Sequence, residues 1–346
     1  MKMIGAVREQ PARDLASEPS GRVSIALCTY NGERFLREQL DSFLTQTRLP
    51  DELVICDDRS SDSTVSIIES FSDAAPFPVH LYINETNLGS TGNFQRAISL
   101  CGGDLIFLSD QDDVWRHDKV DALCQIFRAN PNVGLVFSDA EVVGADLRPL
   151  GYRLWQSMEF GARSQARLEA GGAFEVLLKH NVVTGAAMAF RRSLRDVAMP
   201  IPSEWIHDGW IAMILSLCSE LRSYREPLIR YRQHGQNQVG GLRKNLQGEL
   251  AYMQHVGPQQ YLHVAQQYRA VLDWVKGRPD LPSWAAAKQQ LEAKIAHFIH
   301  RAELSSSWAD RMACVSKAWV AGDYRRFSRG WKSALKDAFM PTRQAS

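Results

Sequence analysis

The feature that most constrains the fold of this chain is an alternation of short apolar runs with helical patterns between residues 23 and 138. The apolar runs occupy residues 23–28, 53–56, 79–83, 105–108 and 133–137. In the first interval Leu36, Leu40 and Phe43 recur at helical spacing. Apolar strands that alternate with helices are typical of a parallel sheet covered on both faces. We therefore predict an α/β fold with a mostly parallel sheet flanked by helices.

The rest of the chain predicts a helical appendage to this α/β domain. Further strands are expected at residues 181–190 and 228–231, with a helix at 207–217 between them. From about residue 242 the pattern is helical, with breaks at Pro258, Pro279 and Pro282. A chain of 346 residues is long enough for both parts. We predict a flexible leader over residues 1–21, an α/β domain over 22–240 and a helical C-terminal region over 241–346.

Composition excludes several other classes of protein. The chain carries 40 basic and 39 acidic side chains, without the basic patch that a nucleic-acid partner would require. Its longest apolar run, residues 210–215, is far shorter than the roughly 20 residues that span a bilayer. The six cysteines form no C-x-x-C pair and are interpreted as reduced thiols. We expect a cytoplasmic protein whose membrane contact, if it has one, is peripheral.

Polar residues follow four of the predicted strands, where an open parallel sheet binds its ligands. Three of them, Asp110, Asp112 and Asp113, come directly after the run 105–108. Carboxylates that converge at one sheet edge repel each other unless a cation neutralises them. Oxygen ligands without a thiol or histidine cluster suit Mg²⁺ or Mn²⁺, which completes its shell with water and substrate phosphates. The acidic run therefore predicts a metal site and a diphosphate ligand.

Each of these polar groups also has a purely structural explanation. Acidic residues before a helix complement its dipole, which accounts for Asp118 more readily than for the three acids after the strand. Asp58 and the serines that follow it can serve as turn and cap residues, whereas Asp57 is better placed to accept a hydrogen bond from a pyrimidine N–H. Tyr30 can stack on such a ring or simply pack.

Five motifs together resemble the family 2 glycosyltransferases of the Rossmann-like GT-A fold. They lie in family order across residues 23–240, and each one alone is a weak or moderate signal. The matching stretches are Cys-Thr-Tyr-Asn-Gly at 28–32, Asp-Asp-Arg-Ser-Ser-Asp-Ser-Thr at 57–64, Asn-Leu-Gly at 87–89 with Gly-Asn at 92–93, Leu-Ser-Asp-Gln-Asp-Asp-Val-Trp at 108–115 and His-Asp-Gly-Trp at 207–210.

The resemblance implies roles for individual residues. Asp110 and Asp112 match the family's D-x-D motif, which contacts the ribose and the metal-bound diphosphate, and Asp208 matches its catalytic base. Many members have an acidic residue where this chain has His207. The residues expected to bind the nucleotide-sugar donor are Thr29, Tyr30, Asn31, Glu33, Asp57, Asp58, Asn87, Gly89, Asn93, Asp110, Gln111 and Arg232.

A late motif, Tyr-Arg-Gln-His-Gly-Gln-Asn at residues 231–237, also resembles related GT-A enzymes. There a histidine can join the metal shell, so His234 is a candidate ligand beside Asp110 and Asp112; the alternative is a histidine satisfied at a strand end. Arg232 either clamps the departing diphosphate or pairs with an acidic side chain.

The family resemblance predicts an inverting transfer in which Asp208 takes the acceptor proton. The chain lacks the Q-x-x-R-W motif of processive synthases, which favours addition of a single sugar. Its acidic motif resembles those of bacterial rhamnosyltransferase-like enzymes of O-antigen and other surface polysaccharides. The expected donor is dTDP-rhamnose or a UDP-sugar, and the expected acceptor is a glycan or a lipid-linked saccharide.

Two other classes of protein remain as alternatives. A Mg²⁺-dependent phosphatase of the haloacid dehalogenase type also has a D-x-D after a strand, usually an early one. A non-catalytic module that binds sugar nucleotides or a glycan, such as a decayed enzyme, is the second, but every expected site residue is present. A nucleotidyltransferase would need a Gly-rich loop after the first strand, which Thr-Tyr-Asn-Gly at 29–32 does not supply.

Near the C-terminus, apolar residues recur every four positions at Phe327, Trp331, Leu335 and Phe339, in a basic segment. Such a stripe most often packs on its own domain. The alternative is an amphipathic contact with an anionic membrane.

Overall fold

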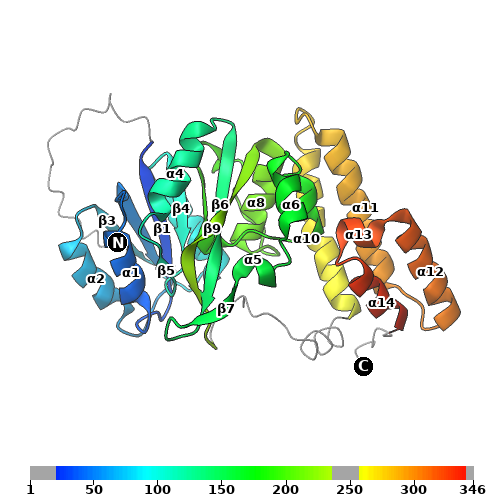
Figure 1. Cartoon of the computed structure of the whole chain (residues 1–346), viewed down its shortest axis with the longest axis horizontal. Helices are drawn as coiled ribbons and strands as arrows, with labels where there is room; N and C mark the ends of the chain where they lie inside the picture. Colours follow the sequence, from blue (N-terminus) through cyan, green and yellow to red (C-terminus); the bar gives the residue numbers. More distant parts are fainter. Residues whose placement is uncertain (1–20, 236–256, 340–346) are drawn as a thin grey trace. The chain divides into compact units, whose positions relative to one another are not determined.

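The computed structural model describes residues 21–235 and 257–339 (Figure 1). The chain forms two compact units that interleave along the sequence. The sheet unit comprises residues 1–154, 184–200 and 222–237, and the helical unit comprises 155–183, 201–221 and 238–346. The predicted leader falls almost entirely outside the described residues. The predicted boundary at residue 240 stays a prediction.

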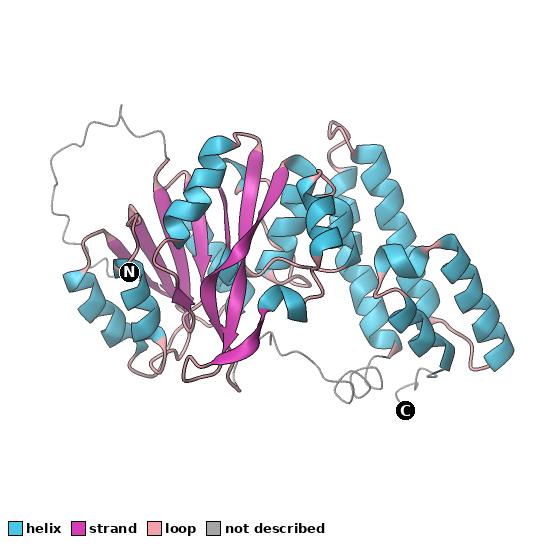
Figure 2. Cartoon of the chain, in the orientation of Figure 1, coloured by secondary structure: helices cyan, strands magenta, loops and turns pink. Residues whose placement is uncertain are grey.

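The sheet unit is built on four parallel strands in the order β3-β2-β1-β4 (Figure 2). Their bounds are Val23–Thr29 (β1), Glu52–Asp57 (β2), Val79–Ile83 (β3) and Leu105–Ser109 (β4). Every residue of β1, β2 and β4 is buried, as expected for strands covered on both faces. The parallel part of the predicted sheet is confirmed.

Three helices connect these strands, and a fourth follows the last of them. They are α1 (Leu36–Leu44), α2 (Thr64–Ala74), α3 (Gly89–Leu100) and α4 (Lys119–Ala129). The apolar residues that predicted α1, namely Leu36, Leu40 and Phe43, are all buried. The four-residue spacing therefore did identify the face that packs inward.

The second half of the sheet is antiparallel, which the apolar runs did not indicate. Strand β8 (Met188–Arg191) lies between β4 and β6 (Val133–Val143) and runs antiparallel to both. Strand β9 (Glu220–Arg232) pairs antiparallel with the two-residue β5 (Val114–Trp115), and β7 (Pro149–Arg153) pairs with β6. The order of this half is β4-β8-β6-β9-β5.

Three predicted strands have other limits than expected. The run 133–137 is only the first part of β6, which continues to Val143. The stretch 181–190 forms strand only from Met188, after a 3₁₀ turn at Gly185–Ala187. The Asn181 side chain bonds both backbone groups of Val183, at 2.9 and 3.0 Å, and so competes with a strand ladder. The expected strand at 228–231 is the end of the longer β9.

All six cysteines are free thiols. Cys28 and Cys56 are register partners on β1 and β2. Burial raises the pKa of the Cys56 thiol to about 12 and that of Cys28 well above its usual value, so both stay protonated. Their environment is that of core residues rather than of a redox pair.

The helical unit consists of nine α-helices within the described residues. The four earlier ones are α5 (Leu154–Ser157), α6 (Ala162–Glu169), α7 (Ala173–Lys179) and α8 (His207–Cys218). The five later ones are α10 (Pro258–Lys276), α11 (Trp284–Ala302), α12 (Trp308–Ala321), α13 (Asp323–Phe327) and α14 (Trp331–Phe339). As predicted, the prolines mark helix limits: Pro258 begins α10, and the other two lie between α10 and α11.

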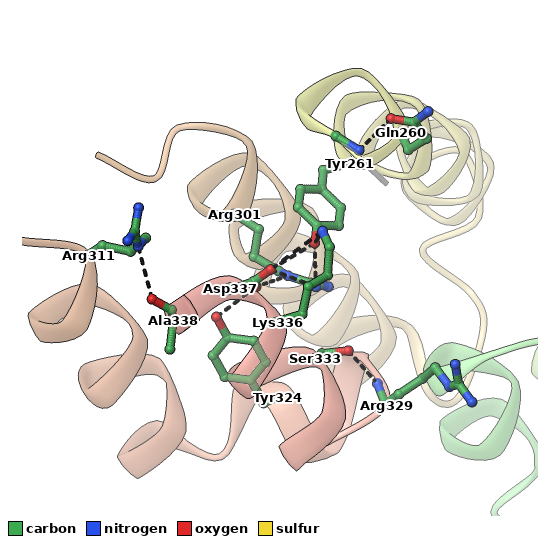
Figure 3. A network of polar contacts seen from close by, with 11 residues as sticks. Gln260, Tyr261, Arg301, Arg311, Tyr324, Arg329, Ser333, Lys336, Asp337 and Ala338 are labelled. Atoms are coloured by element: carbon green, nitrogen blue, oxygen red, sulfur yellow. Dashed lines mark hydrogen bonds and ion pairs between the residues drawn. The ribbon is translucent and has the colours of Figure 1, made fainter. Parts of the chain in front are cut away.

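A buried ion pair joins the last helices (Figure 3). The Asp337 carboxylate on α14 accepts hydrogen bonds from Arg301 Nε on α11 at 2.6 Å and from the hydroxyls of Tyr261 and Tyr324 at 2.8 and 2.9 Å. Burial alone would lower the pKa of Arg301, but Asp337 and the tyrosines outweigh it and the pKa is raised. The interior of this unit therefore depends on a charged pair. None of the helices in the described residues is long and apolar enough to cross a bilayer.

Candidate functional site

The loops after β1 and β4 are joined by one side chain of the acidic motif. Gln111 Oε1 accepts from the Tyr30 backbone N–H at 2.8 Å, and Gln111 Nε2 donates to the Tyr30 carbonyl at 3.0 Å. A Cβ added to Gly32 would lie 2.2 Å from the same amide, so a larger residue there would displace the Gln111 side chain from this position. Gln111 thus serves as a clamp, while the Tyr30 ring is 52% exposed and can stack on a ligand.

The loop after β1 is also bonded to the loop after β2. Asn31 has a left-handed backbone, with φ of 47°, and its Oδ1 accepts from the Ser61 N–H at 2.9 Å. Its own N–H donates to Ser60 Oγ at 2.8 Å. The Glu33 carboxylate accepts from the Ser63 N–H at 3.0 Å, at the start of α2. These contacts hold the polar edge of the sheet in one shape.

Asp57 is buried where β2 ends, and its carboxylate receives three hydrogen bonds. Oδ2 accepts from Thr29 Oγ1 at 2.7 Å and from Ser60 Oγ at 2.6 Å, and Oδ1 accepts from the Ser60 N–H at 2.8 Å. An ionised carboxylate offers about four acceptor positions, so Oδ1 retains one. Thr29 thereby acts through Asp57, whose remaining acceptor position belongs to a fully buried residue.

Asp58 organises the loop after β3. Its carboxylate accepts from Asn84 Nδ2 and the Leu88 N–H, both at 2.7 Å, and from the Gly89 N–H at 2.9 Å. Gly89 has a φ of +70°, which favours glycine, and begins α3. The two N–H groups lie at the amino end of that helix, where a carboxylate is stabilised. Asp58 is thus engaged inside the protein.

The two predicted asparagines, Asn87 of this loop and Asn93 on α3, also bond to the protein. Asn93 Nδ2 donates to the Cys56 carbonyl at 2.8 Å, and its Oδ1 accepts from Asn84 Nδ2 at 2.9 Å. Asn87 Nδ2 donates to the Asp58 carbonyl at 3.3 Å. Four predicted loops therefore meet at one edge of the sheet.

The acidic motif meets the end of β9. His234 Nε2 lies 2.7 Å from Asp112 Oδ2, and the His234 ring packs on Phe35 with centroids 4.8 Å apart. Within residues 21–235 and 257–339, no three carboxylate, imidazole or thiol groups form a complete metal-binding cluster. The pair nevertheless suits Mg²⁺ or Mn²⁺, which typically takes one or two protein ligands and completes its shell with water and phosphate.

Asp113 is the buried member of the motif. Its Oδ1 accepts from the Arg232 N–H at 2.9 Å, while Oδ2 is buried and has no hydrogen-bond partner among the described residues. Burial raises the pKa of Asp113 well above its usual value, and the charges of Asp112 and Asp110 raise it further. This crowding of carboxylates is the situation that a cation relieves. The donor set therefore fits a divalent metal.

Arg232 has a different environment from the one expected of a diphosphate clamp. Its guanidinium is buried: Nε donates to the Asp112 carbonyl at 2.7 Å, and the other nitrogens bond the Ala145 carbonyl and the Glu38 carboxylate. It also lies over the Phe35 ring, 4.5 Å from the centroid. The guanidinium therefore binds the backbone of the acidic motif and other protein groups, and this leaves it engaged within the protein rather than toward a ligand.

Sequence reasoning missed three supporting residues. Phe35, just before α1, and Glu38, in its first turn, contact Arg232. Lys119 at the start of α4 donates to the Ala186 carbonyl at 2.6 Å. The Lys119 ammonium also lies over the Trp115 ring, 3.4 Å from the centroid. Phe35 has the spacing of a core residue, and the other two resemble solvated charges. Only their buried partners distinguish them.

Asp208 belongs to the helical unit, in the first turn of α8. Its Oδ1 accepts from the Gly209 N–H at 2.5 Å, and an acid here also complements the helix dipole. The preceding His207 is buried, and burial lowers its pKa to about 3. The imidazole is thus neutral at pH 7, unlike the acidic residue that many family members have at that position.

Comparison with known proteins identifies relatives of this chain. The profile described as glycosyl transferase family 2 matches residues 24–197, half of the chain. The chain is 28% identical over 225 residues to the dTDP-rhamnosyl transferase RfbG of Shigella flexneri, covering 62% of this chain and 73% of RfbG. It is 31% identical over 121 residues to WfgD of Escherichia coli, a UDP-Glc:α-D-GlcNAc-diphosphoundecaprenol β-1,3-glucosyltransferase, covering 35% of this chain and 46% of WfgD.

The matches span 66%, 73% and 59% of the lengths of the first three curated relatives. Among solved structures, residues 1–349 of Staphylococcus aureus TarS, crystallised with UDP-GlcNAc, superpose with a TM-score of 0.57. The two are 16% identical, and the alignment covers 92% of this chain and 89% of TarS 1–349. This likeness confirms the predicted GT-A fold.

Proposed function

The chain belongs to glycosyl transferase family 2, and from this premise we propose that it moves a single sugar from a nucleotide-sugar donor to a hydroxyl group of a glycan or lipid-linked acceptor. Inversion of the anomeric carbon and dependence on a divalent cation are parts of the proposal. Family membership excludes the dehalogenase-type phosphatase.

One observation carries this proposal: the loops after β1, β2, β3 and β4 are bonded to one another beside the carboxylates of residues 110–113. An edge of this kind combines an exposed aromatic ring, one unfilled acceptor position on the buried Asp57 and a cluster of acids. Those three features correspond to a nucleobase, its N–H group and a cation-bound diphosphate. We assign stacking to Tyr30 and base recognition to Asp57.

The cation would be held by Asp112 and His234, with Asp110 as the further ligand. When bound, a divalent cation there neutralises the charge that develops on the departing diphosphate. Arg232 contributes by keeping the Asp112 backbone in place, since its guanidinium bonds the carbonyl of that residue. It is thus proposed as a positioning residue.

Asp208 is proposed as the general base because of its position in the motif at 207–210. It takes the proton of the acceptor hydroxyl while the acceptor oxygen bonds to the anomeric carbon. The bond from that carbon to the diphosphate breaks, and its electron pair leaves with the nucleoside diphosphate. The neutral His207 is not available as a second base, because its low pKa reflects a buried ring with little proton affinity.

The names of the relatives guide the choice of substrates. RfbG is named as a dTDP-rhamnosyl transferase, and WfgD as using UDP-Glc on a sugar linked to diphosphoundecaprenol. We therefore propose dTDP-rhamnose or a UDP-sugar as the donor and a saccharide of bacterial surface polysaccharide synthesis as the acceptor. A lipid-linked acceptor of this kind places the reaction at the cytoplasmic face of a membrane.

A thermal-unfolding screen of the full chain with dTDP-, UDP- and GDP-sugars, each with and without Mn²⁺, tests the proposal. We expect stabilisation by one nucleotide class, and only with Mn²⁺. Asp112→Asn should remove the metal-dependent part of the shift. Asp73→Asn, an exposed carboxylate on α2, is the matched control and should retain it. Stabilisation that is unaffected by Mn²⁺ would contradict the metal assignment.

A further inference from the structure

The apolar stripe predicted near the C-terminus is divided by the structure. Phe327 ends α13 and is fully buried. Trp331, Leu335 and Phe339 all lie on α14 and are 60%, 49% and 63% exposed. A spacing of four residues places these three side chains on one side of the helix. Packing within the domain, the expected role of such a stripe, therefore holds for Phe327 and not for the other three.

The rest of α14 is firmly anchored. Ala334 and Ala338, which flank the exposed stripe, pack in a cluster with Val315 and Tyr324. Asp337, on the side away from the stripe, forms the buried ion pair with Arg301 (Figure 3). Because these contacts fix the rotation of the helix about its axis, its apolar outer side is a defined surface of the helical unit. Trp308 and Val320 of the adjoining α12 are exposed as well.

The charge of this segment is the second observation. Residues 308–339 carry seven basic and three acidic side chains, although the whole chain is nearly balanced at 40 and 39. Lys317 on α12 and Arg325 and Arg326 on α13 are exposed; of the acids, Asp337 is buried and already paired, whereas Asp310 is exposed. The exposed charge of the segment is thus net positive. Exposed Trp, Leu and Phe beside Lys and Arg are the composition of helices that lie in the interface of an anionic bilayer.

We propose that α14, with the adjoining α12, docks the helical unit onto an anionic membrane surface. Trp331, Leu335 and Phe339 enter the boundary between headgroups and acyl chains, and the exposed cations contact lipid phosphates. The purpose of this membrane contact, which is to bring the enzyme to a lipid-linked acceptor, rests on the proposed function. The contact itself depends only on the surface of α14 and α12, so membrane binding is tested without donor or acceptor.

The test is flotation of the full chain with vesicles of phosphatidylcholine alone and of phosphatidylcholine mixed with phosphatidylglycerol. We expect flotation with the anionic vesicles only, and weakening by salt. The double variant Trp331→Ser with Phe339→Ser should reduce the bound fraction at least tenfold. Replacing one exposed cation, as in Arg326→Gln, should reduce partitioning roughly fivefold, because each charge near the surface contributes about that factor.

A matched control replaces two exposed apolar residues outside the proposed surface, Leu150→Ser with Leu262→Ser. This control should float like the parent chain. An unchanged unfolding temperature shows that the variants are folded. Equal partitioning of the Trp331/Phe339 variant and the parent would overturn the proposal, as would no flotation. Self-association in vesicle-free buffer that the same variant abolishes would assign the surface to a second copy and overturn it too. Failure of donor binding, by contrast, would leave the flotation result standing.

Discussion

Replacing Asp337 by asparagine should destabilise the helical unit strongly. The Asp337 carboxylate accepts two bonds from Arg301, at 2.6 and 3.3 Å, and one each from Tyr261 and Tyr324. An amide keeps the shape but turns one acceptor into a donor. Whichever way it is oriented, its N–H₂ group faces an N–H of the arginine, which cannot turn away as a hydroxyl can.

The size of the effect follows from these contacts. A hydrogen bond to a charged group contributes about 1.5–3 kcal/mol, so weakening the two from Arg301 costs about 3–6 kcal/mol. Breaking a buried ion pair from one side costs about 3–5 kcal/mol, in agreement. For a unit of this size each kcal/mol lowers the melting temperature by about 2–4 °C, which gives a fall of about 6–20 °C.

Tryptophan fluorescence is the suitable readout, because eight of the nine tryptophans lie in the helical unit and only Trp115 lies in the sheet unit. Asp273→Asn is the matched control: its partner Lys276 is on the surface of α10 at 3.3 Å, and such pairs contribute about 0.2–1 kcal/mol. If both variants melt within about 2 °C of the parent chain, which corresponds to no more than about 1 kcal/mol, the ion pair does not stabilise this unit as reasoned.

Three further outcomes are expected. Acid should destabilise the helical unit, because burial lowers the pKa of His207 and of His297 to about 3. Below about pH 6.5 the unfolded chain therefore binds protons that the folded chain does not. The unfolding free energy falls by about 1.4 kcal/mol per group for each pH unit down to about pH 3. Burial also lowers the pKa of His180 in the same unit, so in urea titrations at pH 7 and pH 5 His297→Gln should reduce this loss without abolishing it, and an unchanged loss would exclude His297 as a source. Asp208→Asn should lower turnover roughly 10² to 10⁴-fold while nucleotide-induced stabilisation persists, and near-normal turnover would remove the base assignment. Arg232→Lys should weaken metal-dependent donor binding without altering its nucleotide preference, because an ammonium cannot make the guanidinium's several bonds around Asp112; a changed preference would indicate direct contact with the donor.

Much of the sheet unit could be predicted from the chain alone. The parallel strands are uninterrupted apolar runs with polar residues at their ends, and both features are local. Because parallel strands end at the same edge, the meeting of Tyr30, Asp57 and Gln111 follows from topology. Strand β8 could not be placed in the same way, because an apolar run does not reveal which neighbour it pairs with or in which direction.

The candidate site likewise has one part that the sequence predicts and another that only the structure shows. Residue types and spacing identify Asp112 and His234 as candidates, but only the folded chain brings the carboxylate of one against the imidazole of the other. The same holds for Arg232, whose sequence position suits either a ligand contact or an internal ion pair. Its buried guanidinium indicates the second, because hydrogen bonds to three separate segments and the Phe35 ring engage it.

The sequence alone therefore identifies the acidic motif, the strand that precedes it and the family to which the chain belongs. Only the tertiary structure decides which of several similar side chains are buried or paired inside the protein and which remain exposed. Phe327 and Trp331 occupy equivalent positions in one stripe, yet one is buried and the other is 60% exposed. Periodicity defines a helix face, but whether a neighbour covers that face depends on residues distant in sequence.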